Sequence, residues 1–148
     1  MPPTGPNPYL KTKILTATPE ELRLMLYEGA IRFAQQARTA IQEKNWESSY
    51  NALMRAQKIV LELSTSLNHQ ADPVLCDKLS ALYTYIYKLL VDANIEHQTK
   101  PVDEALRLLE YEKETWQLLM AKLAEQGIGR NTLNGAQTQQ TAMSSLPK

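Results

Sequence analysis

The 148-residue sequence predicts an all-α protein, specifically an antiparallel up-down four-helix bundle. Apolar residues recur at helical spacing over four long segments, cap-forming residues and prolines stand where these segments start, and strand-like alternation is nearly absent. Each segment has about 25 residues and would span about 40 Å as a helix. The links between segments have roughly two to five residues, and such short links force consecutive helices to run antiparallel.

The first long helix is expected to begin after Thr18. This threonine is a suitable N-cap, Pro19 suits the first helical position, and Glu21 completes a capping box with Thr18. The helical pattern continues to about Lys44. The sequence therefore predicts a helix over residues 19–44.

The three later helices have similar start signals. Asn45 can cap the second, Asp72 and Pro73 begin the third, and residues 99–101 begin the fourth, which Gly127 is expected to end. The residues expected to face the core are Leu53, Val60, Leu67, Leu75, Leu79, Leu82, Ile86, Leu89, Leu90, Ala93, Val102, Leu106, Leu109, Trp116, Met120 and Leu123.

The two ends of the chain differ in composition from the bundle, which is expected over residues 18–126. Residues 1–17 begin with a proline-rich stretch and are expected to form an extended, mobile segment that covers a groove. Residues 127–148 are rich in polar side chains and lack periodicity, so we expect them to be disordered.

Composition excludes several classes of function. The 16 basic and 16 acidic residues cancel, which argues against a nucleic-acid partner or an anionic membrane surface. No segment has the length and hydropathy of a signal peptide or a membrane span. The single cysteine, Cys76, excludes an intrachain disulfide and fits a reducing compartment. We therefore expect a cytoplasmic protein without membrane insertion.

Signals for catalysis, metal binding or a cofactor are weak. No Glu-x-x-His motif of a di-iron bundle is present, and His69 and His97 fall at the expected ends of different helices. Cys76 has no His or Asp at a suggestive spacing, and a lone helical cysteine is most often a packed side chain. Phosphate-binding glycine loops are also missing. We expect neither an enzyme nor a cofactor.

The first long helix carries two apolar stripes at nearly opposite angles. The stripe that we expect to face the core consists of Leu22, Leu26, Gly29 and Phe33. The second stripe consists of Leu24, Tyr27 and Ile31. Two interpretations stay open: this helix is central and packed on both sides, or the second stripe is a groove surface that accepts partner helices.

The third helix carries a further surplus of aromatic residues. Tyr83, Tyr85 and Tyr87 stand two residues apart, so they spread around the helix and cannot all enter one core. Tyrosine offers a large contact area at a low entropy cost, which favours recognition. The surplus favours an interaction surface, although tyrosines lying flat on a bundle would explain it equally.

The stretch NPYLKTKILTATPEELRLMLYEGAIRFAQQA resembles the start of the FliS family of flagellar export chaperones. The residues that match the family's pattern are Tyr9, Thr16 to Pro19, Glu21, Leu22, Leu24, Leu26, Tyr27, Glu28, Gly29 and Ala30. The likeness continues through ALMRAQKIVLELSTSLN, LSALYTYIYKLLVDAN and Trp116, and so covers about residues 7–125. The segment HQADPVLCDK departs from the family because it lacks the glycines often found there.

The resemblance implies a four-helix bundle that binds the disordered C-terminal segment of flagellin, prevents its premature polymerisation and delivers it to the flagellar type III export gate. The client would wrap around the bundle with short helices in apolar grooves. The N-terminal segment would contribute to client binding or cover a groove in the free protein. The candidate partner-binding residues are Tyr9, Leu10, Ile14, Leu24, Tyr27, Ile31, Tyr83 and Tyr87.

Two other classes of function remain as alternatives. One is a regulatory or structural bundle that dimerises through its apolar stripes, whereas the chaperone interpretation predicts a monomer or a weak dimer. The other is an enzyme or metal bundle, which the missing ligands disfavour. Measuring the mass of the protein with and without a flagellin peptide, and its metal content, would separate the three.

Overall fold

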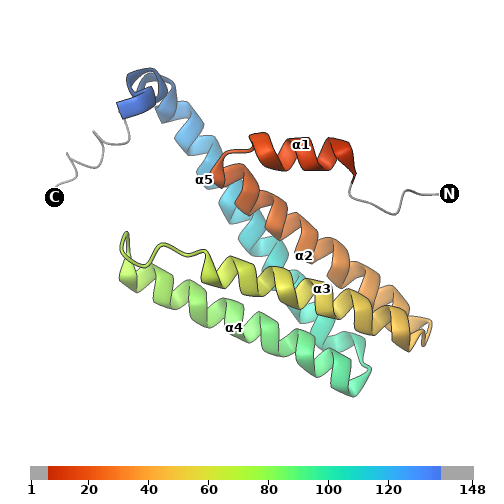
Figure 1. The fold of residues 1–148 in the computed structure, drawn as a ribbon. Helices are drawn as coiled ribbons and strands as arrows, with labels where there is room; N and C mark the ends of the chain where they lie inside the picture. The colour runs from red at the N-terminus through yellow and green to blue at the C-terminus, as the bar shows by residue number, and fades with distance from the viewer. Residues whose placement is uncertain (1–6, 138–148) are drawn as a thin grey trace. The chain divides into compact units, whose positions relative to one another are not determined.

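The computed structural model of the chain describes residues 7–137, with side chains for residues 7–126. The described residues form helices and no strands, and consecutive long helices run antiparallel, which confirms the all-α class (Figure 1). The helices are α1 (Pro8–Thr16), α2 (Pro19–Gln42), α3 (Trp46–Thr65), α4 (Pro73–Glu96) and α5 (Thr99–Gln137).

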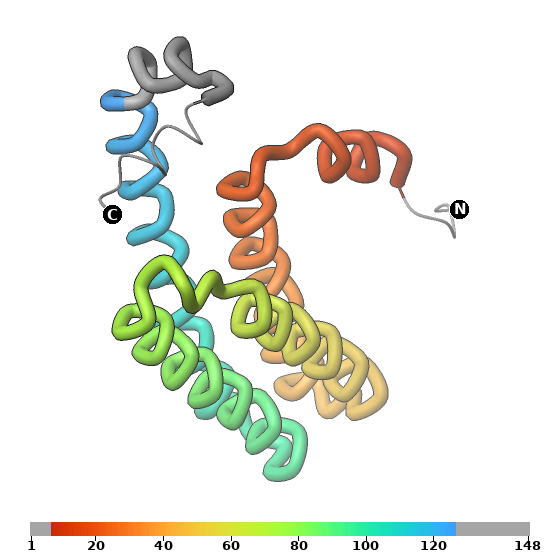
Figure 2. Tube along the Cα trace, turned by 60° about the vertical axis from the view of Figure 1, so that its left-hand side comes forward, coloured from red at the N-terminus to blue at the C-terminus, as the bar shows by residue number. Residues whose placement is uncertain are grey.

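The chain forms two compact units, residues 1–113 and 114–148. The first unit contains α1 to α4 and the beginning of α5, and the second contains the rest of α5. Within the first unit α2 packs along α3, and α3 packs along α4 (Figures 1 and 2).

The predicted helix starts at Thr18, Asn45 and Asp72 are all confirmed. The backbone N–H of Glu21 donates to Thr18 Oγ1 at 3.1 Å, and the N–H of Thr18 donates back to Glu21 Oε1 at 2.9 Å. The side chain of Asn45 accepts from the third residue of α3, and that of Asp72 accepts from the third residue of α4. These caps satisfy backbone donors that lack partners inside a helix.

The N-terminal segment is a helix and not the extended segment that we expected. Asn7 caps it, with its Oδ1 accepting from the backbone N–H of Tyr9 at 2.9 Å. Pro8 then occupies the first turn, where a proline costs little because its missing N–H would have no helical partner. Residues 1–6, with the remaining prolines of the leader, lie outside the described residues.

The C-terminal helix also differs from the prediction, because α5 passes Gly127 and continues to Gln137. Glycine costs a helix only about 1 kcal/mol relative to alanine. No proline stands between Gly127 and Gln137 to break the helix. The expected disorder of residues 138–148 lies outside the described residues.

The core of the first unit combines aliphatic residues with many alanines. Leu53, Val60, Ile86 and Leu90 are buried as predicted. Leu75 is exposed, because the buried face of α4 begins one residue later, at Cys76. The other residues of this core are Tyr27, Ala30, Ile31, Ala34, Ala37, Ala40, Ile41, Ala52, Ala56, Leu63, Tyr83, Leu89, Ala93, Val102, Ala105 and Leu109.

Candidate functional site, an apolar groove between the first three helices

The second apolar stripe of α2, for which two interpretations were open, is mostly core. Tyr27 is 2% exposed and Ile31 7% exposed, and Ala30 and Ala34 between and beyond them are fully buried. The interpretation of this stripe as a groove surface is therefore wrong for Tyr27 and Ile31, whose burial fits a helix packed on this side. The physical reason is that alanines on the same face let the neighbouring helices approach closely. Leu24, the third residue of the stripe, is half-buried.

The face of α2 that we expected to be core lies largely at the surface. Leu22 is 36% exposed, and Leu26 and Phe33 are half-buried. This face borders a cavity of about 480 Å³, which we call the apolar groove. The apolar groove is formed by Leu10 and Ile14 of α1, by Leu22, Met25, Leu26 and Gly29 of α2, and by Ile59 of α3.

Gly29 forms part of the floor of the apolar groove. A Cβ atom at this position would lie 3.2 Å from the Cδ1 of Ile59 on α3. A side chain here would therefore push against Ile59 and reduce the space between α2 and α3. The glycine avoids this tight contact with Ile59.

The candidate residues of α1 take different positions relative to the apolar groove. Leu10 and Ile14 line it, whereas Tyr9 does not line it and is 74% exposed. No residue of α1 is buried. The helix therefore forms one wall of the groove through partly exposed side chains and is held there by little buried surface.

The tyrosines of α4 divide between the core and a second surface. Tyr83 is fully buried, so the prediction that it is a surface residue is wrong. Tyr87 is 36% exposed and borders a small cavity of about 160 Å³ between α3 and α4, together with Leu61. A wider cavity of about 370 Å³ lies between the same helices and includes Tyr50 and Ile95. We call these two cavities the α3–α4 surface.

A polar network inside the bundle was missed by the sequence analysis. Arg23 donates to Tyr83 Oη at 2.9 Å, to the carbonyl of Leu63 at 3.2 Å and to Ser66 Oγ at 3.1 Å. The hydroxyl of Tyr83 also forms a hydrogen bond with that of Tyr27. These contacts explain why Tyr27 and Tyr83 can be buried, since a buried hydroxyl needs a partner.

Burial affects the ionisation of two groups near this network. Burial, followed by the neighbouring Tyr83, raises the pKa of Tyr27, which therefore stays neutral and can keep its hydrogen bond. Burial also raises the pKa of Glu112, against the opposing attraction of Arg23. The network is thus electrostatically coupled to α5.

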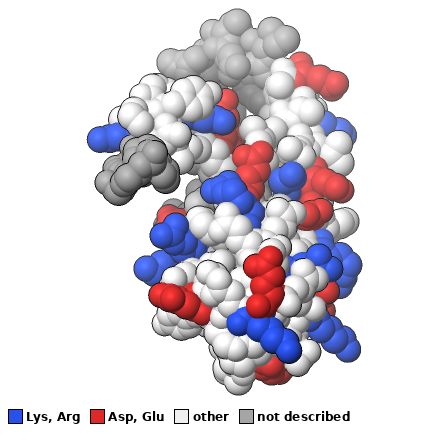
Figure 3. Space-filling model, turned by 90° about the vertical axis from the view of Figure 1, so that its right-hand side faces the viewer, with Lys and Arg blue, Asp and Glu red and all other residues white. Residues whose placement is uncertain are grey.

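The described side chains offer little chemistry beyond these contacts. Among them, no group of three or more His, Cys, Asp and Glu residues is arranged to hold a metal ion. No described helix is long and apolar enough to cross a membrane. On the face shown in Figure 3, Lys and Arg are interspersed with Asp and Glu. The feature that stands out is exposed apolar surface in the apolar groove.

Comparison with known proteins identifies relatives over most of the chain. The family described as "Flagellar protein FliS" matches residues 4–123. A flagellar secretion chaperone FliS from Bacillus subtilis strain 168 is 40% identical over 96 residues, covering 63% of this chain and 71% of that protein. The chaperone of the same name from Campylobacter jejuni is 30% identical over 110 residues, covering 74% of this chain and 86% of that protein. The chaperone of the same name from Salmonella typhimurium is 25% identical over 118 residues, covering 79% of this chain and 87% of that protein. This chain belongs to the FliS family.

Proposed function

We propose that this protein is a flagellar secretion chaperone that binds the disordered C-terminal segment of flagellin in the cytoplasm. It keeps the client from polymerising early and delivers it to the flagellar type III export apparatus. The observation that carries the proposal is the apolar groove. It leaves Leu22, Met25 and Leu26 of α2 partly exposed, whereas Tyr27 and Ile31 on the opposite face of the helix are buried.

The groove has the properties needed to bind an amphipathic helix. It is concave, and most of its lining is apolar. The charged side chains that also line it are Lys13, Glu28, Arg32 and Glu62. A helix places apolar residues three and four positions apart along one face, which matches such a groove. Burying this surface under a client helix gives a hydrophobic gain of about 25 cal/mol per Å².

The α1 helix forms a movable wall of the groove in this proposal. It contributes no buried residue, so its attachment is marginal and it can rearrange when the client arrives. Two effects oppose each other when α1 is removed. Loss of a competitor for the groove tightens client binding, whereas loss of Leu10, Ile14 and the exposed Tyr9 as contacts weakens it. We expect the loss of contacts to dominate, because tyrosine is a frequent hot-spot residue.

The α3–α4 surface offers a place for a second part of the client. Leu61 and Tyr87 are exposed beside one cavity, and Tyr50 and Ile95 beside the other. Both cavities lie between α3 and α4, whereas the apolar groove lies on the other side of α3, between α3 and α2. A client that occupies both surfaces would wrap around α3.

Titration of a flagellin C-terminal peptide tests the proposal. The full chain should bind the peptide with one-to-one stoichiometry and run as a monomer or weak dimer in mass measurements. A variant lacking residues 1–15 should bind more weakly while its circular dichroism shows that the other helices remain. A stable dimer that binds no peptide would contradict the proposal and favour a dimerising bundle. Unchanged affinity after the truncation would remove α1 from the binding site.

A further inference from the structure

A second cavity continues along α2 and α3 beyond the apolar groove. Its volume is about 540 Å³, and it lies toward the turn that joins the two helices. Phe33 of α2 and Arg55 and Lys58 of α3 line it, as do the side-chain amides of Gln36 and Asn51. We call this cavity the basic hollow.

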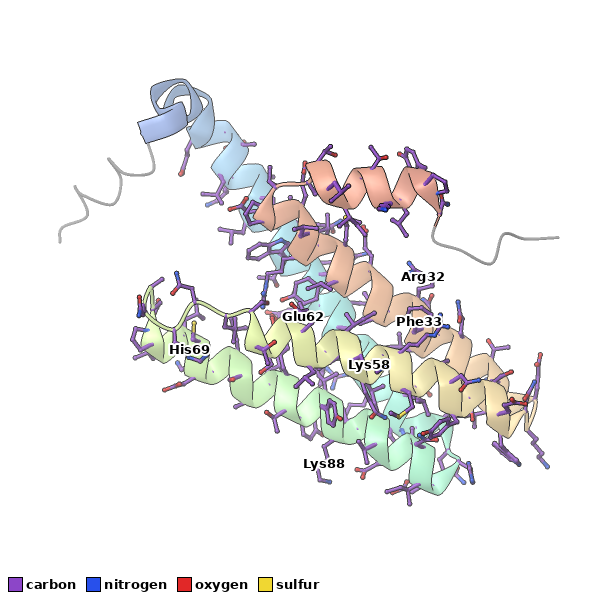
Figure 4. All side chains as sticks on the ribbon, viewed as in Figure 1. Arg32, Phe33, Lys58, Glu62, His69 and Lys88 are labelled. Atoms are coloured by element: carbon purple, nitrogen blue, oxygen red, sulfur yellow. The ribbon has the colours of Figure 1, made fainter. Side chains whose placement is uncertain are left out.

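Cations surround the aromatic ring of the basic hollow. The guanidinium carbons of Arg32 and Arg55 lie 5.3 Å and 5.4 Å from the centroid of the Phe33 ring. This is within the range of cation–π attraction, which holds both guanidinium groups over the ring. Figure 4 shows Arg32 and Phe33 on α2 and Lys58 on the neighbouring stretch of α3.

These cations have no acidic partner within the described part of the chain. No carboxylate oxygen of the described side chains lies within 4.0 Å of the charged nitrogens of Arg32, Arg55 or Lys58. By contrast, Arg38, which follows Phe33 by more than one helical turn on α2, forms an ion pair with Asp103. The basic hollow therefore presents positive charge beside an aromatic side chain, and the carboxylates of Glu28 and Glu62, four residues from Arg32 and Lys58, form no ion pair with these two cations.

The chemistry of the hollow selects a carboxylate. Guanidinium groups donate two parallel hydrogen bonds to a carboxylate, and such charge-assisted bonds are stronger than neutral ones. The amide groups of Gln36 and Asn51 add further donors.

The hollow and the apolar groove are parts of one surface. Arg32 lines the apolar groove and also lies over Phe33 in the basic hollow. From Leu22 to Phe33 the helix rises about 16 Å at about 1.5 Å per residue. A helical client that starts at Leu22 would therefore reach the hollow after about eleven residues.

We propose that the basic hollow binds Asp or Glu side chains of the client segment whose apolar face occupies the apolar groove. This inference rests on the proposed function. The carboxylates fix the register of the client, because an apolar groove alone allows a helix to slide by one turn. The client segment is thus an amphipathic helix with acidic residues about three turns from its first apolar anchor.

Charge reversal at the hollow tests the inference. The variant Arg55→Glu/Lys58→Glu should bind the flagellin C-terminal peptide at least about tenfold more weakly, as expected for losing close charge pairs. The control Lys78→Glu/Lys100→Glu changes the net charge equally at exposed positions of α4 and α5, and its affinity should stay within about twofold. A peptide in which Asn and Gln replace Asp and Glu should bind the parent chain weakly. It should bind the Arg55→Glu/Lys58→Glu variant with the same weak affinity, because the carboxylates that the hollow binds are already gone. A peptide with Lys at these positions should recover affinity for the hollow variant.

Other outcomes would overturn the inference. If the hollow variant binds normally while Leu26→Ala weakens binding, the groove is the client site and the hollow is not. If neither variant weakens peptide binding, the proposed function of the groove fails as well. If only amidation of the peptide's C-terminus weakens binding, the hollow binds the terminal carboxylate, and the assignment to Asp and Glu side chains is wrong.

Discussion

The two faces of α2 have similar apolar residues and opposite environments. Tyr27 and Ile31 on one face are almost completely buried. Leu22, Leu26 and Phe33 on the other are half-buried or exposed and border cavities. Large apolar side chains alone therefore do not distinguish the core face of this helix from its binding face.

The positions of the alanines distinguish the core face of α2 from its outer face. Ala30, Ala34 and Ala37 recur at helical spacing on the buried face and are fully buried. Small residues allow helix axes to approach closely, so the core forms along the alanine face. The bulkier opposite face cannot be covered by the same neighbours, and it stays available for a partner.

Truncation of Ile31 should have the largest effect on stability. Ile31→Ala leaves a cavity in the core and should lower the free energy of unfolding by about 2–5 kcal/mol. The matched change on the other face, Leu22→Ala, should cost less than about 1 kcal/mol because Leu22 is already partly hydrated. Thermal and urea unfolding of both variants measure the difference. Equal losses would mean that the two faces are not distinct.

Removal of the Tyr83 hydroxyl should have the next largest effect. Tyr83→Phe takes one hydrogen-bond partner from both Arg23 and Tyr27 inside the bundle, at a cost of about 1–3 kcal/mol. Tyr85→Phe on the same helix removes a hydrogen bond to Glu104 at an exposed position and should change the stability much less. If urea unfolding shows the same midpoint for both, the buried network does not stabilise the core face.

Glu112 should give a smaller, pH-dependent effect. Burial raises the pKa of this carboxyl in the folded state. The protonated carboxyl of Glu112 therefore makes its full contribution to stability below its usual pKa, and this contribution is lost as pH rises through the folded-state pKa. Glu112→Gln should therefore gain stability relative to the parent chain as pH rises above the usual pKa of a glutamate carboxyl. Glu110→Gln, at an exposed position, controls for the lost charge. A pH-independent difference for Glu112→Gln would contradict the assignment.

Local features of this fold could be predicted from the sequence, because their causes are local. The caps at Thr18, Asn45 and Asp72 depend on residues within one helical turn, and all three form as expected. The helical state of α1 could have been predicted from the same signals, since Asn7 and Pro8 repeat the pattern of a cap followed by a proline. The prolines before Asn7 led us to expect an extended segment instead of this helix.

The environment of each face could not be predicted in the same way. The hydrogen bond between Arg23 and Tyr83 joins residues that are 60 positions apart, and no local pattern indicates it. The choice between the two faces of α2 depends on how α3 packs against it. Alanine spacing was the available signal, but it is weak because alanine is common on all helix faces. The apolar groove and the basic hollow depend on the same packing.

The most direct test of the central claim compares two leucines. Leu26 lines the apolar groove, whereas Leu75 is an exposed leucine of α4 that does not line it. The affinity of the flagellin C-terminal peptide should fall about tenfold or more for Leu26→Ala, as expected for truncation of a central contact. It should stay unchanged for Leu75→Ala, and both variants should remain folded in thermal melts. Equal affinity of the two folded variants for the peptide would contradict the claim that the outer face of α2 is the client site.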